Sequence, residues 1–329
     1  MGKIKIGIVG YGNLGRGVHK ALSQNPDIEC MGVFTRRSPE TVELIHHDIK
    51  AYSMEEILSF KGKIDVLILC GGSASDLPVM APSLACDFNI VDSFDNHSQI
   101  PKHFENVDIK ARLNKTVAII SAGWDPGLFS LNRLIGESVL PNGTTNTFWG
   151  TGVSQGHSDA IRRLDGVKSA IQYTVPVEET VKLVRSGSEK NFSPRERHLR
   201  RCYVVLKEGA DEEKVKHAIV TMPAYFSDYD TEVNFISQEE FNENHQKMPH
   251  GGFVIRHGRT GENEENNQLL EFSLKLDSNP EFTSSILLAF ARAAYRISAL
   301  GDFGAKTIFD IPLSYLSPKK HEDLLKNLL

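Results

Sequence analysis

Three glycines close to the N-terminus constrain the fold more than any other feature. The segment KIKIGIVGYGNLGRG places Gly10, Gly12 and Gly15 between a short apolar run and a helical pattern. In this spacing the first glycine permits a tight turn, the second lets backbone N–H groups approach a phosphate, and the third lets helix and strand pack closely. The triplet alone is a weak signal that an ordinary glycine-rich turn also satisfies. Its place between a strand and a helix predicts a dinucleotide-binding βαβ unit.

The residues that follow continue this alternation as far as about residue 140. Apolar strands are expected at KIKIGIVG, CMGVFT, DVLILC, NIVDSF and VAIISA, and helices at residues 14–24, 39–45, 54–60, 76–86, 100–112 and 126–140. Alternation of this kind predicts a parallel sheet with helices on both faces, and uninterrupted apolar strands fit burial on both sides. We therefore expect an α/β fold whose residues 1–145 form a Rossmann-type, doubly wound domain.

The pattern changes after the turn-rich segment PNGTTN. Longer strands are expected at AIQYTVP, RCYVVLK, TEVNFIS, GGFVIRH and QLLEFSLKLD, with helices at residues 178–184 and 212–219 between them. These elements predict a second, α+β domain over residues 146–301, built on a mostly antiparallel sheet. A long helical pattern ends at Gly301, and the tail, residues 302–329, is expected to return to the first domain.

Composition excludes several classes of function. The net charge is -5 over 329 residues, which argues against binding to nucleic acid or to an anionic membrane. No segment approaches the ~20 apolar residues of a membrane span, and the N-terminal apolar run is too short for a signal peptide. The 4 cysteines are scattered without CxxC spacing, so neither a disulfide framework nor a metal site is indicated. We expect a cytoplasmic protein that acts on small molecules.

The end of the second strand indicates which dinucleotide is bound. An NAD site carries Asp or Glu about 20 residues after the glycines, where the carboxylate accepts hydrogen bonds from the ribose. Here Thr35, Arg36 and Arg37 occupy that place. Two guanidinium groups and a hydroxyl suit a 2′-phosphate, which a carboxylate would repel. The sequence predicts NADP(H), the alternative being two solvated arginines on a loop.

Two acidic residues fall beyond the carboxyl ends of predicted strands, where ligands of open α/β sheets lie. Asp95 follows NIVDSF, and Asp125 lies in SAGWDPG. A pair of carboxylates near a nicotinamide could bind an amine and accept its proton. Asp125 could instead cap a helix that begins with Pro126, and Asp95 could form an Asx turn. Both interpretations remain open at this point.

The second domain contains a possible carboxylate clamp. Thr174 ends a strand, Arg200 lies in HLRRCYVV, and His250 lies in MPHGGF, where two glycines predict an exposed turn. A guanidinium, a hydroxyl and an imidazole suit a carboxylate, although isolated residues of these types are more often structural. The segment TGVSQGHSD adds a loop that opens a helix and offers backbone N–H groups to an anion.

Taken together, these segments closely resemble the meso-diaminopimelate dehydrogenase family. The likeness runs nearly end to end, through GYGNLGRG, FTRR, VDSFDNH, GWDPGLFSLNR, TFWGTGVSQGHSDAIRR, VKSAIQYT, MPHGGF and LKLDSNPEFT. The resemblance implies a reversible, NADP-dependent oxidative deamination of meso-2,6-diaminopimelate at its D-centre. The products would be L-2-amino-6-oxopimelate, which cyclises to tetrahydrodipicolinate, and ammonia, in lysine biosynthesis. It also implies homodimers or assemblies of dimers formed through the second domain.

The resemblance assigns roles residue by residue. It implies that Asp95 and Asp125 are catalytic and, with Trp124, hold the reacting amino group. Substrate contacts are implied for Trp149, Gln155 and Gly156, and a grip on the distal L-centre for Thr174, Arg200, His250 and Asn279. Cofactor contacts are implied for Gly10, Tyr11, Gly12, Asn13, Leu14, Gly15, Thr35, Arg36, Arg37, Cys70, Gly71, Gly72, Ser73, Asp92, Ser93, Phe94, Ser121, Ala122 and Gly123.

Two other functions stay open. A D-amino acid dehydrogenase of broader specificity would share the cofactor site and differ at the distal clamp, whose expected residues are all present here. A non-catalytic NADP-binding protein would bind the cofactor tightly without turnover.

Overall fold

The computed structural model describes residues 2–46 and 49–329, which form two compact units. The first consists of Met1–Leu131 and Pro280–Leu329, and the second of Asn132–Asn279. The chain passes between them within helix α4 (Leu128–Val139) and at the first residue of helix α10 (Asn279–Ala299). This division differs from the expected boundary at residues 145/146, and nearly all of α10, rather than the tail alone, belongs to the first unit.

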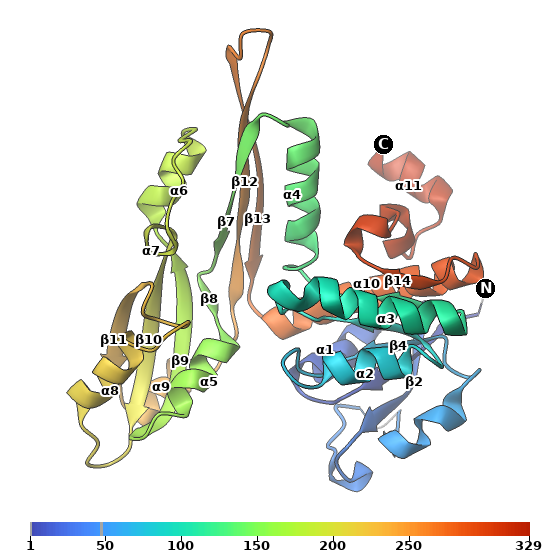
Figure 1. Ribbon diagram of the computed structural model, residues 1–329. Helices are drawn as coiled ribbons and strands as arrows, with labels where there is room; N and C mark the ends of the chain where they lie inside the picture. The colour runs from blue at the N-terminus through green and yellow to red at the C-terminus, as the bar shows by residue number, and fades with distance from the viewer. Residues whose placement is uncertain (1, 47–48) are drawn as a thin grey trace. The chain divides into compact units, whose positions relative to one another are not determined.

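The first unit is built on a parallel sheet of seven strands in the order β14-β6-β5-β4-β1-β2-β3 (Figure 1). Its strands are β1 (Ile4–Val9), β2 (Ile28–Thr35), β3 (Ala51–Ser53), β4 (Val66–Leu69), β5 (Asn89–Asp92), β6 (Val117–Ile119) and β14 (Gly304–Lys306). Its helices are α1 (Asn13–Ala21), α2 (Leu77–Leu84), α3 (Ile100–Asn114), α10 and α11 (His321–Leu328). The expected doubly wound α/β fold is confirmed.

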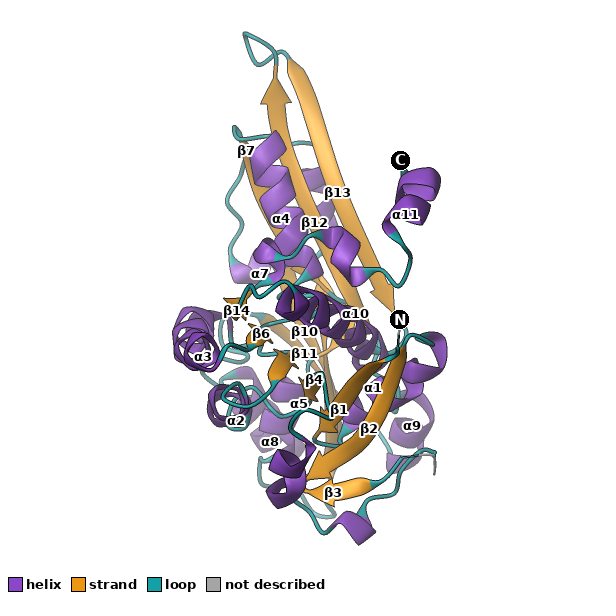
Figure 2. Cartoon of the chain, turned by 90° about the vertical axis from the view of Figure 1, so that its right-hand side faces the viewer, coloured by secondary structure: helices purple, strands orange, loops and turns teal. Residues whose placement is uncertain are grey.

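Burial explains the apolar strands of this sheet. Helices α2 and α3 lie on one face, and α1 and α10 on the other (Figure 2). Side chains of β1 and β4 that point to either face, such as Ile6, Leu67 and Ile68, are fully buried. A strand covered on both faces needs apolar residues at every position, which is why these strands do not alternate.

Two expected helices are shorter or tighter than predicted. Residues 54–60 form a 3-10 helix, Met54–Phe60, which opens with a capping box between Ser53 and Glu56. The pattern at residues 39–45 gives only the 3-10 turn Pro39–Thr41. The capping box satisfies the first N–H groups of a helix whichever helical type follows, so this signal locates the start without fixing the type.

Helix α10 joins the first unit through contacts that are remote in sequence. The Ser284 hydroxyl donates to the Leu14 carbonyl at 2.9 Å, which ties α10 to α1. Further along α10, the buried Arg292 donates from Nε to Asp27 Oδ2 at 2.6 Å. The Arg292 guanidinium lowers the pKa of Asp27. These contacts account for the placement of α10 with residues 1–131.

The second unit contains two sheets instead of the single one expected. The first has the order β11-β10-β9-β8, and the second β13-β12-β7. The strands are β7 (Gly143–Trp149), β8 (Gly152–Val153), β9 (Val167–Pro176), β10 (His198–Leu206), β11 (Asp230–Phe235), β12 (His250–Thr260) and β13 (Asn266–Leu276). The helices are α5 (Gln155–Arg162), α6 (Glu178–Arg185), α7 (Pro194–Arg197), α8 (Glu212–Val220) and α9 (Gln238–Asn244). Apart from the parallel pair β10–β11, the pairing is antiparallel, as predicted.

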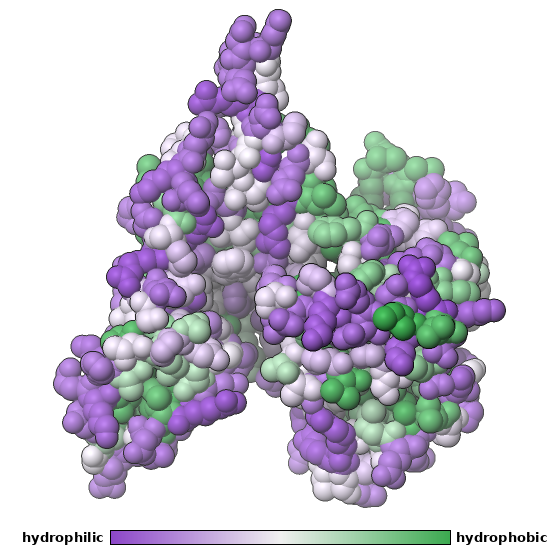
Figure 3. Space-filling view, viewed as in Figure 1, coloured by the Kyte–Doolittle hydropathy of each residue, from purple (hydrophilic) through white to green (hydrophobic). Residues whose placement is uncertain are grey.

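The two glycines of MPHGGF lie inside a sheet, so the prediction of an exposed turn at these residues is wrong. Gly251 and Gly252 belong to β12, are buried, and have φ values of 142° and 148°. A Cβ on Gly251 would lie 2.1 Å from the Leu274 carbonyl oxygen. Only glycine allows the neighbouring strand to approach this closely. The tip of the β12–β13 hairpin, by contrast, is hydrophilic (Figure 3).

Candidate active site

The glycine triplet forms a cradle between β1 and α1. Gly10 has a φ of 90°, and a Cβ on Gly15 would lie 2.1 Å from the Gly10 carbonyl oxygen. A Cβ on Gly12 would meet no atom within 4 Å, so the backbone is open there. Helix α1 has no side chain bonded at its N-cap and no acidic residue in its first turn. Its first N–H groups and its dipole therefore fit the pyrophosphate of a dinucleotide.

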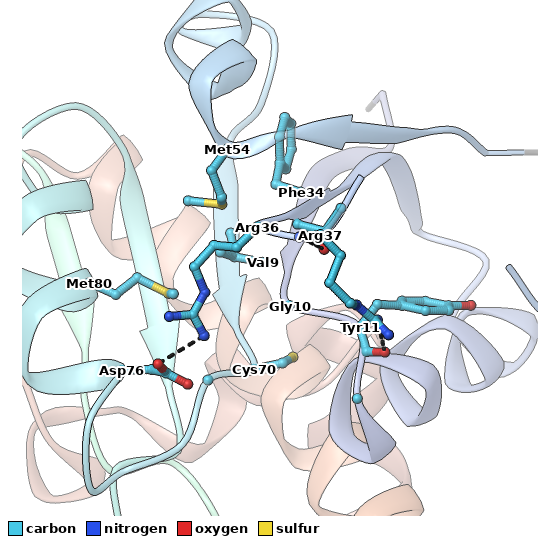
Figure 4. A pocket seen from close by; sticks show the side chains of 13 residues that line it. Val9, Gly10, Tyr11, Phe34, Arg36, Arg37, Met54, Cys70, Asp76 and Met80 are labelled. Carbon is cyan, nitrogen blue, oxygen red and sulfur yellow. Dashed lines mark hydrogen bonds and ion pairs between the residues drawn. The ribbon is translucent and has the colours of Figure 1, made fainter. Parts of the chain in front are cut away.

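A pocket of about 330 Å³ continues from this cradle (Figure 4). It is bounded by the ends of β1, β2 and β4 and by the start of α2. Its lining combines the predicted cofactor residues with apolar side chains: Val9, Gly10, Tyr11, Gly12, Phe34, Thr35, Arg36, Arg37, Met54, Cys70, Gly71, Asp76 and Met80. Burial raises the pKa of the Cys70 thiol, so this cysteine stays neutral in the pocket.

The two arginines at the end of β2 have different partners. Arg37 donates from Nη2 to the Tyr11 carbonyl at 3.2 Å, and its backbone N–H donates to Thr35 Oγ1 at 3.1 Å. Arg36 Nη2 lies 2.9 Å from Asp76 Oδ1, on the far side of the pocket. Asp76 is not among the residues predicted from the sequence, because nothing in GGSASD distinguishes it from an ordinary turn residue.

Asp92 organises the carboxyl ends of β5 and β6. Its buried carboxylate accepts N–H bonds from Phe94 at 3.0 Å and Ser121 at 2.9 Å, and its second oxygen lies 2.8 Å from His103 Nε2. Its carbonyl accepts the Ala122 N–H at 2.8 Å. A carboxylate bonded on both oxygens fixes the two loops that follow these strands. Asp92 thus has a structural role in the loops for which cofactor contacts are predicted, and its own cofactor contact stays a prediction.

These two loops carry the predicted acidic residues. Asp95 is exposed, and its N–H donates to Ser73 Oγ at 3.1 Å. Asp125 is half-buried, and the neighbouring Trp124 packs edge-on against Phe129 with ring centroids 5.2 Å apart. Helix α4 begins at Leu128, so the prediction that Pro126 is its first residue is wrong. The N–H groups of Leu128 and Phe129 bond the carbonyls of Gly123 and Trp124.

Two of the predicted clamp residues of the second unit, Arg200 and Thr174, are in direct contact. Arg200 on β10 lies opposite Thr174 on β9, and its Nη1 donates to Thr174 Oγ1 at 2.6 Å. The guanidinium carbon lies 3.7 Å from the ring centroid of Tyr229, a residue that the sequence reasoning missed. Arg200 is 7% exposed, and no carboxylate of the described residues pairs with it. Burial lowers its pKa, as expected for a cation without a counter-charge.

The remaining predicted residues of this unit lie on adjoining segments. Gly152 of β8 pairs with Thr174, and the Val153 N–H donates to the Pro249 carbonyl at 2.9 Å, next to His250. Gln155 Nε2 lies 3.2 Å from Met248 Sδ. The backbone carbonyl of Met248 accepts the Asn279 N–H at 2.9 Å. These contacts link the segments that carry Thr174, Gln155, His250 and Asn279.

Trp149 and the start of α5 complete this region. Trp149 is 38% exposed, stacks on His198 with centroids 5.4 Å apart, and donates its N–H to His198 Nε2 at 2.9 Å. A Cβ on Gly156 would meet no atom within 4 Å, and the N-cap Ser154 makes no side-chain cap. The opening turn of α5 is thus uncapped and open at Gly156, and anion binding there stays a prediction.

The charge of Arg200 affects two histidines. Burial, and then Arg200, lowers the pKa of His157 to about 4 and that of His198 to about 3. Both imidazoles are therefore neutral at neutral pH. The buried positive charge of Arg200 therefore favours an anionic ligand group here.

Residues 2–46 and 49–329 contain no cluster of three or more metal-ligating side chains. No helix within these ranges has the length and apolar character needed to cross a bilayer.

Comparison with known proteins identifies the family. Residues 123–278 match the diaminopimelic acid dehydrogenase C-terminal domain. Over 329 residues the chain is 61% identical to a meso-diaminopimelate D-dehydrogenase of Ureibacillus thermosphaericus, covering 100% of both chains. The chain belongs to this dehydrogenase family. It is accordingly an oxidoreductase with a Rossmann-type domain, and the family expected from the sequence is confirmed.

Two solved structures match with the same fold. The Corynebacterium glutamicum diaminopimelate dehydrogenase in complex with diaminopimelate has a TM-score of 0.92 and 42% identity, covering 100% of both chains. An engineered D-amino acid dehydrogenase bound to NADP+ has a TM-score of 0.87 and 40% identity, covering 99% of this chain and 100% of the other. The cofactor expected from Thr35, Arg36 and Arg37 is the one bound in that relative.

Proposed function

We propose that this member of the family catalyses the reversible, NADP-dependent oxidative deamination of meso-2,6-diaminopimelate at its D-centre. The products are L-2-amino-6-oxopimelate, which cyclises to tetrahydrodipicolinate, and ammonia. The observation that carries this proposal is Arg200, a buried cation that pairs with no carboxylate in the part of the chain that the structure describes. An unpaired buried charge is costly unless a ligand supplies its partner. A carboxylate of diaminopimelate is such a partner.

The second unit is assigned to the centre that does not react. Arg200 and Thr174 bind its carboxylate, and His250, Asn279, Gln155 and the open turn at Gly156 add polar contacts. Diaminopimelate carries two similar amino-acid centres, so an enzyme must fix one of them to choose which centre reacts. Anchoring the L-centre supplies that choice, because a correctly oriented substrate gains both rate and stereochemical selectivity.

The first unit is assigned to the D-centre and the cofactor. Asp95 and Asp125 bind the amino group, which must lose a proton before it can be oxidised to an imine, and Trp124 packs beside them. Thr35, Arg36 and Arg37 bind the part of NADP+ that carries the adenine and the 2′-phosphate, and the cradle holds the pyrophosphate. When bound, NADP+ supplies the hydride acceptor. Imine hydrolysis then releases ammonia.

Product analysis tests this proposal. Incubation with meso-diaminopimelate and NADP+ should yield NADPH and ammonia in equal amounts, and the reverse reaction should require ammonia. Tight NADPH binding without turnover would contradict the proposal and favour a non-catalytic NADP-binding protein. Rapid turnover of simple D-amino acids would favour the broader dehydrogenase.

We further propose a cytoplasmic homodimer, or an assembly of dimers, that works in lysine biosynthesis. Strand β13 supports association through the second unit, because it lies at an edge of its sheet and is eleven residues long. Its Leu269 side chain is 48% exposed. A long edge strand with apolar side chains is a template for pairing with another chain. Sedimentation of wild-type protein and of Leu269→Lys tests this: the variant should dissociate at concentrations where wild type does not.

A further inference from the structure

The carboxylate of Asp76 stands in the cofactor pocket, where a negative charge opposes a phosphate. Arg36 extends from the end of β2 toward Asp76, and Met54 and Met80 lie beside it (Figure 4). Arg36 Nη2 and Asp76 Oδ1 are 2.9 Å apart. Arg37 points to the Tyr11 carbonyl instead, at 3.2 Å. The two neighbouring arginines thus serve different parts of one pocket.

We propose that Asp76 is a positioning residue for the cofactor. It holds the Arg36 guanidinium across the pocket as a flat surface on which the adenine stacks. Recognition of the 2′-phosphate then falls on Thr35 and Arg37. The proposal depends on NADP as the cofactor and is independent of the amino acid that is oxidised.

The anchoring of Asp76 supports this role. Its second oxygen, Oδ2, accepts the Gly72 N–H at 3.0 Å, so one carboxylate oxygen is fixed by the loop after β4 and the other meets Arg36. The Asp76 side chain is 21% exposed and that of Arg36 is 69% exposed. An ion pair this exposed contributes little to folding. The Arg36–Asp76 ion pair instead fixes the orientation of the Arg36 side chain, which is long and otherwise mobile.

The chemistry of the pocket supports adenine as the group under Arg36. Phe34, Met54 and Met80 give the pocket apolar walls, which suit an uncharged base. A guanidinium plane stacks well on an aromatic face. The Asp76 charge partly neutralises Arg36, which makes Arg36 a weaker phosphate ligand and leaves its stacking surface intact.

Two cofactor fragments separate the two arginines. Both 5′-AMP and 2′,5′-ADP contain adenine, but only the second carries the 2′-phosphate. Their dissociation constants are measured by calorimetry, or by displacement of NADPH fluorescence where binding is weak. The proteins are wild type, Arg36→Met, Arg37→Met, Asp76→Asn and the double variant Arg36→Met/Asp76→Asn. Asparagine retains an acceptor for the Gly72 N–H and removes only the charge, and thermal melts verify folding.

The proposal predicts that Arg36→Met weakens both fragments by the same factor, whereas Arg37→Met weakens 2′,5′-ADP alone. Asp76→Asn should weaken both fragments about three- to tenfold, the cost of ordering one long side chain. It should have no further effect in the Arg36→Met background. The KM for NADP+ should follow these changes in each variant.

Three results would overturn the proposal. Loss of 2′,5′-ADP binding alone in Arg36→Met would make Arg36 a phosphate ligand. Tighter 2′,5′-ADP binding in Asp76→Asn would make Asp76 an opposing charge. Equal effects of Asp76→Asn with and without Arg36 would show that Asp76 does not act through Arg36. None of these depends on diaminopimelate, so the proposed reaction can stand if this inference fails.

Discussion

Replacement of Arg200 by methionine tests whether this residue contacts the substrate, as we propose, or instead stabilises the fold. The guanidinium is 7% exposed, donates to Thr174 Oγ1 at 2.6 Å, and lies 3.7 Å from the Tyr229 ring centroid. It has no carboxylate partner among the described residues. Methionine keeps much of the apolar volume and removes the charge. Because a buried, unpaired cation stabilises little, the melting temperature of Arg200→Met should stay the same or rise.

Substrate use should change far more than stability. Losing one desolvated charge contact to the substrate costs about 2–5 kcal/mol. At roughly 1.4 kcal/mol per factor of ten, kcat/KM for meso-diaminopimelate should fall by a factor of about 30 to 4,000. The KM for NADP+ should hardly change, because Arg200 belongs to the second unit. Steady-state kinetics with each substrate varied in turn measures both values.

Arg201→Met is the matched control. Arg201 is the next residue on β10, but its Nε pairs with Glu232 Oε2 at 2.5 Å, and both side chains are partly exposed. Neither kcat/KM nor the melting temperature should change appreciably. The reasoning is refuted if Arg200→Met keeps wild-type kcat/KM, or if its KM values for diaminopimelate and NADP+ rise by the same factor.

Three further predictions concern the acid, the cradle and the response to pH. Asp125→Ala should abolish turnover while the protein still folds, because losing a helix cap alone costs only about 1 kcal/mol. Substantial residual activity would favour a local structural role for Asp125. Gly15→Ala should abolish NADPH binding in a fluorescence titration, because its Cβ would lie 2.1 Å from the Gly10 carbonyl oxygen. Folding lowers the pKa of His157 from 6.5 to about 4. Between pH 6.5 and pH 4 this imidazole is therefore protonated in the unfolded chain and neutral in the folded protein. The free energy of unfolding should therefore fall as pH drops from 6.5 to 4, by up to about 3 kcal/mol for this group, and urea titrations of His157→Gln should show a weaker decline.

The elements that repeat a local pattern could be predicted from the sequence. Gly10 and Gly15 identify the first turn because their spacing reports a backbone requirement rather than a tertiary contact. The buried strands could also be predicted, because burial on both faces requires an apolar residue at each position. The start of the Met54–Phe60 helix could also be located, although its 3-10 form depends on packing around it.

Contacts between distant residues could not be predicted in this way. Asp76 reaches Arg36, and Tyr229 covers Arg200, only because the fold brings their strands and loops together. The buried Arg292 likewise assigns α10 to the first unit through Asp27. Such pairs leave no periodic signal in a single sequence. The family resemblance supplied the list of site residues but none of these partners.

The most direct test of the proposed function compares the stereoisomers of diaminopimelate. Initial rates of NADP+ reduction are measured separately with the meso, LL and DD forms, with D-alanine as a substrate that lacks a distal centre. Anchoring of an L-centre together with oxidation of a D-centre predicts rapid reduction with the meso form alone. Equal rates with the meso and DD forms, or with D-alanine, would contradict the anchoring role of Arg200 and Thr174.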